Sequence, residues 1–391
     1  MLAICAAAAA VVCSGTLSAK AAVDPFHGRG MWIWYVSRSA GGDAAAIAAQ
    51  ARLNGIQTLF VKSGDGGSYW SQFSGSLMRA LHAAGLNVCG WQYVYGRDPM
   101  AEASVGAAAA RTGADCLVID AEGEYQGRYA SAQAYVESLR AAVGRHYPVG
   151  LASFPYVDYH PGFPYSVFLG HDGAQFNLPQ MYWRDIGSSV ETVYRHTYAA
   201  NRIYRRPIRP VGEIYNGATA GEIRVFRRLS VGYRAQGLSW WDFAWASANQ
   251  LWPAVTGPHT SPSEIPPVGF PLLRYGSRGD MVLWLQQLLA SAVPAEQPDG
   301  IFGSQTVANV RLFQARHAIR STGEAGPLTW QALLRLPVKN VRWTASPAKV
   351  AARRRPRGTN AVSATGPAPR SARLPAVAYE IRRPSGEDGA G

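Results

Sequence analysis

Three carboxylates follow a short apolar run in residues 115–125, which read DCLVIDAEGEY. The run 116–119 predicts a β-strand that ends at Asp120, Glu122 and Glu124. Because strand side chains alternate between faces, Asp120 and Glu122 share one face. Two carboxylates crowded in a partly dry site push their pKa values apart, which leaves one protonated and one ionised. Cleavage of a glycosidic bond requires such a pair; the alternative is a D-x-E that occurs by chance in a solvated loop.

The pattern of residues 28–256 predicts the elements that would position this pair. Strand-like runs alternate with Ala-, Leu- and Arg-rich stretches of helical length, and Ala is the strongest helix former. Eight strands alternating with helices over about 230 residues are typical of a (β/α)8 TIM-type barrel in the α/β class. Chemistry in such barrels takes place at the carboxyl ends of the strands. An open doubly wound sheet is the competing arrangement, but no Gly-rich phosphate loop follows the first strand.

The predicted strands are 31–36, 58–62, 87–95, 115–120, 148–154, 175–183, 208–215 and 238–244. The predicted helices are 43–53, 74–84, 100–112, 130–146, 188–202 and 220–236.

Aromatic and polar residues collect at the ends of these strands. Sugars present apolar C–H faces and hydroxyl rims, so aromatic plates with polar groups between them favour a carbohydrate cleft. The alternative is that the Trp and Tyr side chains simply fill the barrel. The candidate substrate-binding residues are Trp34, Tyr93, Gln180, Tyr182, Glu213, Trp241 and Asp242.

The strand at Asp115 resembles the D-x-x-D-x-D-x-E signature of family 18 glycosidases, the chitinase group. Asp115, Asp120 and Glu122 match three positions, and Val118 replaces the second Asp. The D-x-E is also similar to the strand-four motif of family 25 lysozymes. The first-strand Asp of those lysozymes is absent here, because residues 30–37 contain no acid.

Two later strands extend the resemblance to family 18. Tyr182 matches the Tyr of the M-x-Y-D motif, and Trp183 stands where that motif has Asp. Gly237 and Trp241 match a terminal G-x-x-x-W. The departures from the family pattern remove two groups that tune the acid and bind the distorted sugar ring.

The resemblance to family 18 implies a mechanism in which the substrate's own 2-acetamido oxygen attacks the anomeric carbon. Glu122 would be the general acid, and Asp120 would hold the acetamido N–H. Tyr182 would hydrogen-bond the acetamido oxygen, and Trp241 would lie under the reacting sugar. No cofactor is implied.

The departures leave room for a different function. Glu124, Glu213 or Asp242 could replace the missing acidic groups, for example as the base that activates a water molecule. The alternative is a non-catalytic wall-binding or scaffold protein with a degenerate barrel.

The cysteines and histidines give no metal-site spacing, so we expect no metal. Cys89 and Cys116 lie in predicted strands that we expect to be neighbours, so they could pair in an exported protein. Buried free thiols are the favoured interpretation.

A second module is predicted at residues 269–336, after a Pro/Ser-rich linker at 257–268. Its motifs are LRYGSRGD from Leu273, DGIFG from Asp299 and GPLTW from Gly326. They resemble the peptidoglycan-binding domain of bacterial wall hydrolases. The resemblance implies binding of wall glycan or stem peptide; the alternative is a generic helical interaction domain.

Apolar residues at helical spacing predict a compact unit of three helices in this module, for example Val282 and Leu285. Asp280, and Thr306 or Ser304, are candidates for helix starts.

The two ends of the chain differ in composition from the rest. Residues 1–22 are typical of an export signal, with an apolar Ala-rich core and a small-x-small cleavage site. Residues 337–391 carry eleven Lys and Arg against three Asp and Glu, a net charge of +8 of the chain's +13. This tail is predicted to be disordered. It is expected to be attracted to anionic wall polymers; the alternative is that it only keeps the chain soluble. Export argues against nucleic acid as its partner.

Together these features predict a secreted protein of the bacterial cell envelope, expected to be a monomer. Its predicted function is hydrolysis of β-1,4 linkages in 2-acetamido-sugar polymers, with peptidoglycan the expected polymer. After residue 22 no segment is long and apolar enough to span a membrane.

Overall fold

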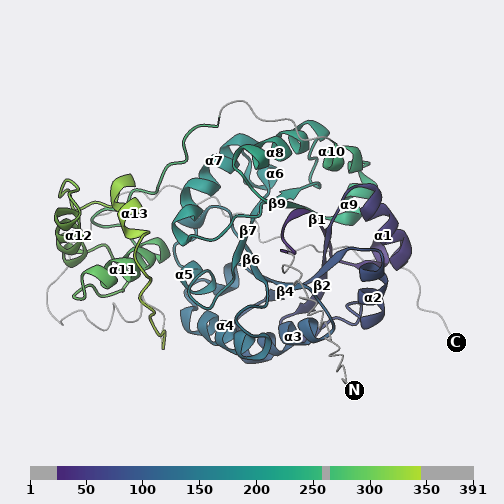
Figure 1. Cartoon of the computed structure of the whole chain (residues 1–391), viewed down its shortest axis with the longest axis horizontal. Helices are drawn as coiled ribbons and strands as arrows, with labels where there is room; N and C mark the ends of the chain where they lie inside the picture. The colour runs from purple at the N-terminus through teal and green to yellow at the C-terminus, as the bar shows by residue number, and fades with distance from the viewer. Residues whose placement is uncertain (1–23, 258–264, 345–391) are drawn as a thin grey trace, which may run out of the picture.

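The structure is a computed structural model that describes residues 24–257 and 265–344 (Figure 1). The predicted export signal at 1–22, most of the predicted linker, and the tail beyond residue 344 lie outside the described residues.

Eight parallel strands close into a barrel within the described residues, which confirms the predicted fold class. The first strand pairs with both the second and the last strand of the chain, and this double pairing closes the sheet. The barrel strands are β1 (Gly28–Ile33), β2 (Thr58–Asp65), β4 (Asn87–Val94), β5 (Cys116–Ala121), β6 (Val149–Ser153), β7 (Phe176–Met181), β8 (Val211–Glu213) and β9 (Gly237–Trp241). A short strand, β3 (Ser68–Tyr69), folds back antiparallel onto β2.

Helices surround the barrel, as Figure 1 shows. Their ends are set by local chemistry: the Thr219 and Glu222 side chains, for example, form a capping box. The helices of this layer are α1 (Ala44–Leu53), α2 (Gly75–Ala83), α3 (Pro99–Arg111), α4 (Tyr129–Val143), α5 (Tyr165–Phe168), α6 (Trp183–Ile186), α7 (Val190–Asn201), α8 (Ala220–Gly232), α9 (Phe243–Ala248) and α10 (Trp252–Thr256).

Alternation along the strands separates two apolar cores. On β5, Cys116 and Val118 belong to the cluster inside the barrel, whereas Leu117 and Ile119 belong to the cluster under the helices. Asp120 therefore follows Val118 on the inner face, at the carboxyl end of the strand.

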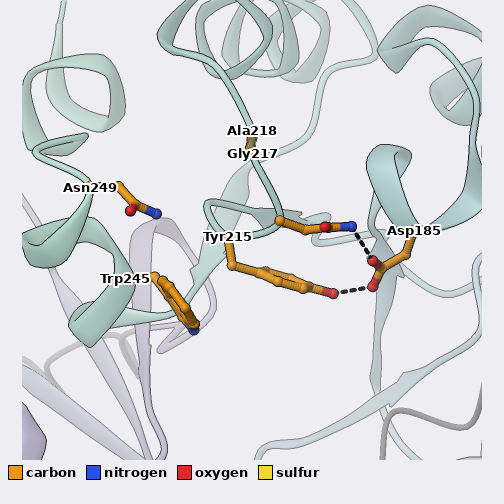
Figure 2. Close-up of a pocket in the computed structure, with 7 residues that line it drawn as sticks. Asp185, Tyr215, Gly217, Ala218, Trp245 and Asn249 are labelled. Atoms are coloured by element: carbon orange, nitrogen blue, oxygen red, sulfur yellow. Dashed lines mark hydrogen bonds between the residues drawn. The ribbon is translucent and has the colours of Figure 1, made fainter. Parts of the chain in front are cut away.

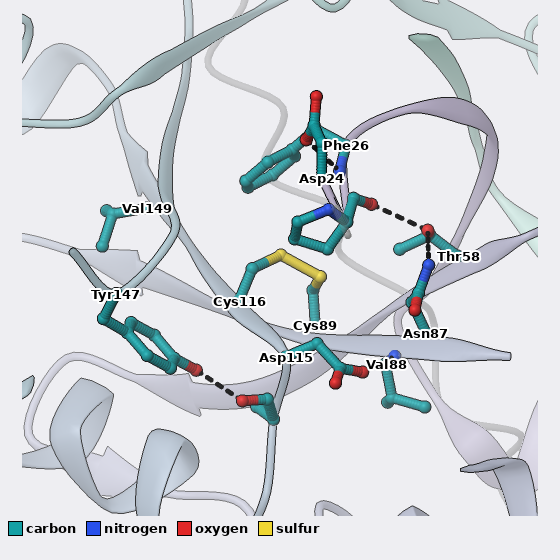
Figure 3. The surroundings of a disulfide bond; sticks show 12 residues. Asp24, Phe26, Thr58, Asn87, Val88, Cys89, Asp115, Cys116, Tyr147 and Val149 are labelled. Atoms are coloured by element: carbon teal, nitrogen blue, oxygen red, sulfur yellow. Dashed lines mark hydrogen bonds between the residues drawn. A yellow bond between two sulfur atoms is a disulfide. The ribbon is translucent and has the colours of Figure 1, made fainter. Parts of the chain in front are cut away.

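Cys89 and Cys116 form a disulfide, so the expectation of free thiols is wrong (Figure 3). The parallel register places the two residues directly opposite each other on β4 and β5, with their Cα atoms 4.5 Å apart. This separation lies within the range that a disulfide spans. The sequence suggested neighbouring strands but did not fix the register that brings the sulfur atoms together.

The second module folds as three helices, α11 (Asp280–Ala292), α12 (Ser304–Arg316) and α13 (Pro327–Leu333). Helices begin at Asp280 and Ser304, as the sequence predicts. Apolar side chains from all three helices are buried in its core: Val282, Leu285, Leu289, Val310, Phe313, Trp330 and Leu333.

Asp280 starts its helix but its carboxylate does not cap it. The side chain points into the barrel layer instead, where it accepts hydrogen bonds from Tyr129, Ser166 and Tyr204. The Asp280 side chain is thus a contact between the two modules, which the sequence did not reveal.

The first residues of the predicted basic tail also pack at this junction. Trp343 is buried against Tyr129 and Leu283, and its backbone N–H donates to Gln133 Oε1 at 2.7 Å. Residues 337–344 therefore differ in character from the disordered tail that was expected to begin at residue 337.

Candidate functional site

The carboxylate pair lies at the carboxyl end of β5, where the barrel opens. Asp120 is buried on the inner face, and Glu122 is half-buried at the start of the 3-10 helix η3 (Gly123–Tyr125). Gln180, on the inner face of β7, donates through Nε2 to Asp120 Oδ1 at 2.9 Å and to Glu122 Oε1 at 3.0 Å. A single amide from β7, two strands away in the sheet, thus holds both carboxyl groups together.

Burial is the main influence on the protonation of this pair. It raises the pKa of Asp120, and the neighbouring Glu122 raises it further, whereas Lys62 lowers it. Burial also raises the pKa of Glu122, against the lowering effect of the Gln180 hydrogen bond. Two such close acids titrate as a unit. The pKa of each carboxyl group is therefore raised, and the pair as a whole is suited to hold a proton.

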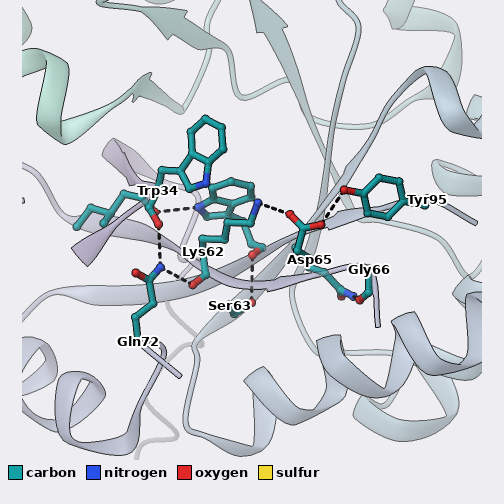
Figure 4. A network of polar contacts seen from close by, with 10 residues as sticks. Trp34, Lys62, Ser63, Asp65, Gly66, Gln72 and Tyr95 are labelled. Carbon is teal, nitrogen blue, oxygen red and sulfur yellow. Dashed lines mark hydrogen bonds and ion pairs between the residues drawn. The ribbon is translucent and has the colours of Figure 1, made fainter. Parts of the chain in front are cut away.

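Lys62 is a functional candidate that sequence reasoning missed (Figure 4). It lies on β2 with only 3% of its surface exposed, and its Nζ is 2.6 Å from Asp65 Oδ2. Tyr95 donates to the other oxygen of Asp65 at 2.7 Å. The Lys62 ammonium also lies over the rings of Trp34 and Trp91, 5.2 and 4.7 Å from their centres.

One signal in the sequence could have identified this ion pair. Lys62 directly ends the apolar run TLFV, so a charge stands at the carboxyl end of a predicted barrel strand. The strand continues beyond the predicted end to Asp65 through a register shift between Lys62 and Gly64. This shift brings Asp65 to the ammonium, and strand periodicity alone does not predict it.

Indole rings form the apolar wall of the barrel mouth. Trp241, at the end of β9, packs its ring 5.3 Å from that of Trp91 and 5.7 Å from those of Trp32 and Trp34. Trp34 and Trp241 are only partly buried, whereas Trp32 and Trp91 fill the interior. Some of these rings are therefore core, and others line the opening. That they form a carbohydrate cleft stays a prediction.

Tyr93 and Tyr182 lie on the inner face of the same opening. Tyr93 donates to Glu124 Oε2 at 2.8 Å, and burial raises its pKa. Burial likewise raises the pKa of Tyr182, with added effects of Tyr215, Asp120 and Glu122. The structure thus places Tyr182 close to the carboxylate pair, where its hydroxyl remains protonated.

Glu213 and Asp242 have structural partners of their own. Glu213 is fully buried and accepts the backbone N–H of Arg184, and burial raises its pKa to about 8. Asp242 caps α9 by accepting the Trp245 backbone N–H at 3.2 Å, and burial raises its pKa to about 6. No described hydrogen bond joins either of them to Asp120 or Glu122.

The two departures from the family 18 motifs have clear locations. Val118 is packed in the barrel core. Trp183 faces the helical layer, where its ring lies 5.4 Å from Phe226. Neither residue contributes a polar group to the opening.

A cavity of about 530 Å³ opens among the segments that follow β7, β8 and β9 (Figure 2). It is lined by Asp185, Tyr215, Asn216, Gly217, Ala218, Trp245 and Asn249. The Tyr215 ring, which lines it, packs edge-on against Tyr182 at 5.7 Å.

Among residues 24–257 and 265–344, no group of three His, Cys, Asp or Glu side chains could hold a metal ion. In the same residues no helix has the length and apolar character to cross a membrane.

The second module matches a known family. Residues 278–333 match the putative peptidoglycan binding domain, which confirms the resemblance drawn from its motifs. No curated protein matches the chain.

Solved structures similar to this chain are barrels of low sequence identity. One is a fungal endo-β-N-acetylglucosaminidase of glycosyl hydrolase family 18, with 12% identity over 58% of this chain and 97% of that chain, at a TM-score of 0.42. A family 18 N-acetylglucosaminidase from Paenibacillus barengoltzii has 10% identity over 59% and 99%, at 0.43. An endo-1,4-β-D-mannanase from Thermotoga petrophila has 10% identity over 56% and 88%, at 0.41. At these values the likeness is one of fold.

Proposed function

We propose that this chain is a cell-wall glycosidase that cleaves β-1,4 linkages next to 2-acetamido sugars, with peptidoglycan as its polymer. The observation that carries the proposal is the buried pair of Asp120 and Glu122, held by Gln180 at the open end of the barrel. The match of residues 278–333 to a peptidoglycan-binding domain supports the choice of polymer. Such a wall protein would act outside the cell, after export by the predicted signal.

In the proposed mechanism, Glu122 donates its proton to the bridging oxygen of the scissile bond as the acetamido oxygen attacks the anomeric carbon. Asp120, whose ionised form Lys62 favours, accepts the acetamido N–H and stabilises the positive charge that develops there. Tyr182 donates to the acetamido oxygen. The Glu122 carboxylate then takes a proton from the water that opens the cyclic intermediate, and this restores the acid.

Two features support Glu122 as the acid rather than as a structural carboxylate. It is half-buried at the opening, so a substrate oxygen can reach it. The ion pairs of the described residues do not include Glu122, so no Arg or Lys holds it in the ionised form. An acid that is both protonated and reachable is the requirement for leaving-group protonation.

The proposal is tested by incubating the purified protein with isolated bacterial walls and measuring new reducing ends and turbidity. Glu122→Gln keeps the size of the side chain and removes the proton, so we expect activity to fall by about 100-fold or more. Wall binding should persist, because the second module is unchanged. Glu137→Gln, on the exposed face of α4, is the matched control and should keep full activity.

An unchanged rate in Glu122→Gln would refute the assignment of the acid. Binding without release of reducing ends by the wild-type protein, from walls or chitin, would support the scaffold function instead.

A further inference from the structure

The cavity beside the carboxylate pair combines one exposed aromatic face with fixed polar groups. Figure 2 shows Trp245, from α9, on one side and Asp185 on the other. Asn216 lies beside Asp185, to which its amide donates a hydrogen bond. The cavity volume of about 530 Å³ is within the range of small-molecule sites. An indole plate opposite carboxylate and amide groups suits a ring with apolar C–H faces and a hydroxyl rim.

The Asp185 carboxylate is oriented by two donors. The Tyr215 hydroxyl donates to Oδ2, and Asn216 Nδ2 donates to Oδ1 at 2.7 Å. A carboxylate has about four acceptor positions, so each oxygen can accept one more bond from a ligand. Asn249 is held in a similar way, because its Nδ2 donates to the Ile214 carbonyl at 3.2 Å and leaves its amide oxygen as an acceptor.

A tight turn forms the rim between these groups. Asn216 and Gly217 both have positive φ angles, 50° and 74°, and the Ala218 N–H closes the turn on the Tyr215 carbonyl at 2.9 Å. Asn and Gly are the residues that adopt this conformation most readily. A Cβ on Gly217 would meet no atom within 4 Å, so the turn leaves this edge of the cavity open.

The cavity is next to the proposed reaction centre. Tyr215 lines it and packs against Tyr182, and Tyr182 is close enough to Asp120 and Glu122 for their charges to raise its pKa. On the other side, α9 carries Trp245 and is capped by Asp242, which directly follows Trp241 of the aromatic wall. A polymer that reaches Glu122 would therefore pass this cavity with a neighbouring sugar unit.

We infer that the cavity is a second sugar subsite, which binds an uncharged pyranose unit of the polymer on Trp245 and accepts its hydroxyl or acetamido hydrogens at Asp185 and Asn249. The inference rests on the proposed function and deepens it. One of the groups that face the cavity, Asp185, is a carboxylate. A sugar unit that carries its own carboxylate would be repelled there, so the subsite selects N-acetylglucosamine-type units over acidic ones.

The test uses the full chain with Glu122→Gln as the parent, so that oligosaccharides are not cleaved. Binding of N-acetylglucosamine oligomers of two and five units is measured by titration calorimetry. We expect the five-unit oligomer to bind more tightly, and Trp245→Ala to weaken its binding on the order of three- to tenfold. Trp245→Phe keeps an aromatic face and should retain most of the affinity.

Asp185→Asn keeps the shape of the side chain and removes its charge. We expect weaker binding of the five-unit oligomer, and better relative binding of an oligomer that alternates N-acetylglucosamine with a carboxylate-bearing sugar. Thermal melting of each variant shows whether the fold is kept.

Equal affinity of the parent and both Trp245 variants for the long oligomer would overturn the subsite, as would no binding to the parent. A different result is that the parent binds the longer oligomer more tightly, Trp245→Ala loses this difference, and the wild-type protein releases no reducing ends from walls. That result would uphold the subsite and reject the hydrolase. The two failures are therefore distinguishable.

Discussion

At the residue scale, the proposed chemistry depends on which of two neighbouring carboxyl groups keeps its proton. Burial raises the pKa of both Asp120 and Glu122, and their closeness prevents easy ionisation of the second. The charge of Lys62 lowers the pKa of Asp120 against these effects, and in the proposed mechanism this is what favours ionisation of Asp120. The sequence motif predicted both residues on one strand face, but β5 ends at Ala121 and Glu122 lies beyond it, at the start of η3. The ammonium that acts on Asp120 comes from another strand, β2.

Lys62→Met should change the pH profile of hydrolysis. Without the ammonium the pKa of Asp120 rises further, so the ionised form that the mechanism needs appears only at higher pH. We expect the acid limb of kcat/KM to move to higher pH and the rate at its optimum to fall by about tenfold or more. An acid limb that stays in place would show that Lys62 does not act on Asp120.

Glu213 gives a stability prediction with a defined sign. Its pKa is about 8 in the folded protein, above its ordinary value near 4.5, so the folded state holds this proton more tightly than the unfolded state. The contribution of this proton to the free energy of unfolding is complete below about pH 4.5. It is lost as pH rises through 8.

Glu213→Gln should therefore be more stable than the wild type at pH 8, on the order of 1–3 kcal/mol, with a smaller difference at pH 5. The amide oxygen can still accept the Arg184 N–H. Urea unfolding at the two pH values measures the change; a difference that does not depend on pH would contradict the burial of an uncharged Glu213.

At the element scale, alternation and helix-forming composition were sufficient to predict the barrel. The eight predicted strands correspond to β1, β2 and β4–β9, with ends that differ by up to a few residues. The register in which neighbouring strands pair could not be predicted from the sequence. The disulfide between β4 and β5 and the Lys62–Asp65 pair on β2 both depend on register, one on pairing across strands and the other on a shift within a strand.

The disulfide allows a test at this scale. Replacing both Cys89 and Cys116 with Ala removes a link across residues that are 27 apart in the chain. We expect a loss of stability of about 2–4 kcal/mol, because the unfolded chain gains freedom. The disulfide lies in the inner core, and Cys116 is at the start of β5, whereas Glu122 follows the end of this strand. The rate of hydrolysis per folded molecule should therefore be unchanged. A loss of activity in the folded double variant would contradict this separation.

At the scale of the whole molecule, the wall-binding domain is docked on the barrel. Asp280 is 1% exposed and accepts the Tyr129 hydroxyl at 3.0 Å, the Tyr204 hydroxyl at 2.8 Å, and both the N–H and hydroxyl of Ser166. Gly279, with φ of 104°, lets the chain approach Pro161, since a Cβ would lie 2.5 Å from it. A simple tether would need none of these contacts.

Asp280→Ala should release the domain, because Tyr129 and Tyr204 would lose a buried acceptor. We expect a larger radius of gyration in small-angle scattering and faster proteolysis between the modules. The rate of hydrolysis of soluble oligosaccharides should be unchanged. Ser304→Ala, at the exposed start of α12, is the control and should stay compact. Unchanged scattering from Asp280→Ala would show that other contacts hold the domain.

The most direct test of the central claim is hydrolysis of purified peptidoglycan in ¹⁸O-labelled water, followed by mass spectrometry of the released fragments. A glycosidase that uses Glu122 puts one ¹⁸O atom at the anomeric carbon of each new reducing end, and Glu122→Gln releases no such fragments. Label in a peptide carboxyl group, or unlabelled fragments, would contradict the proposed reaction.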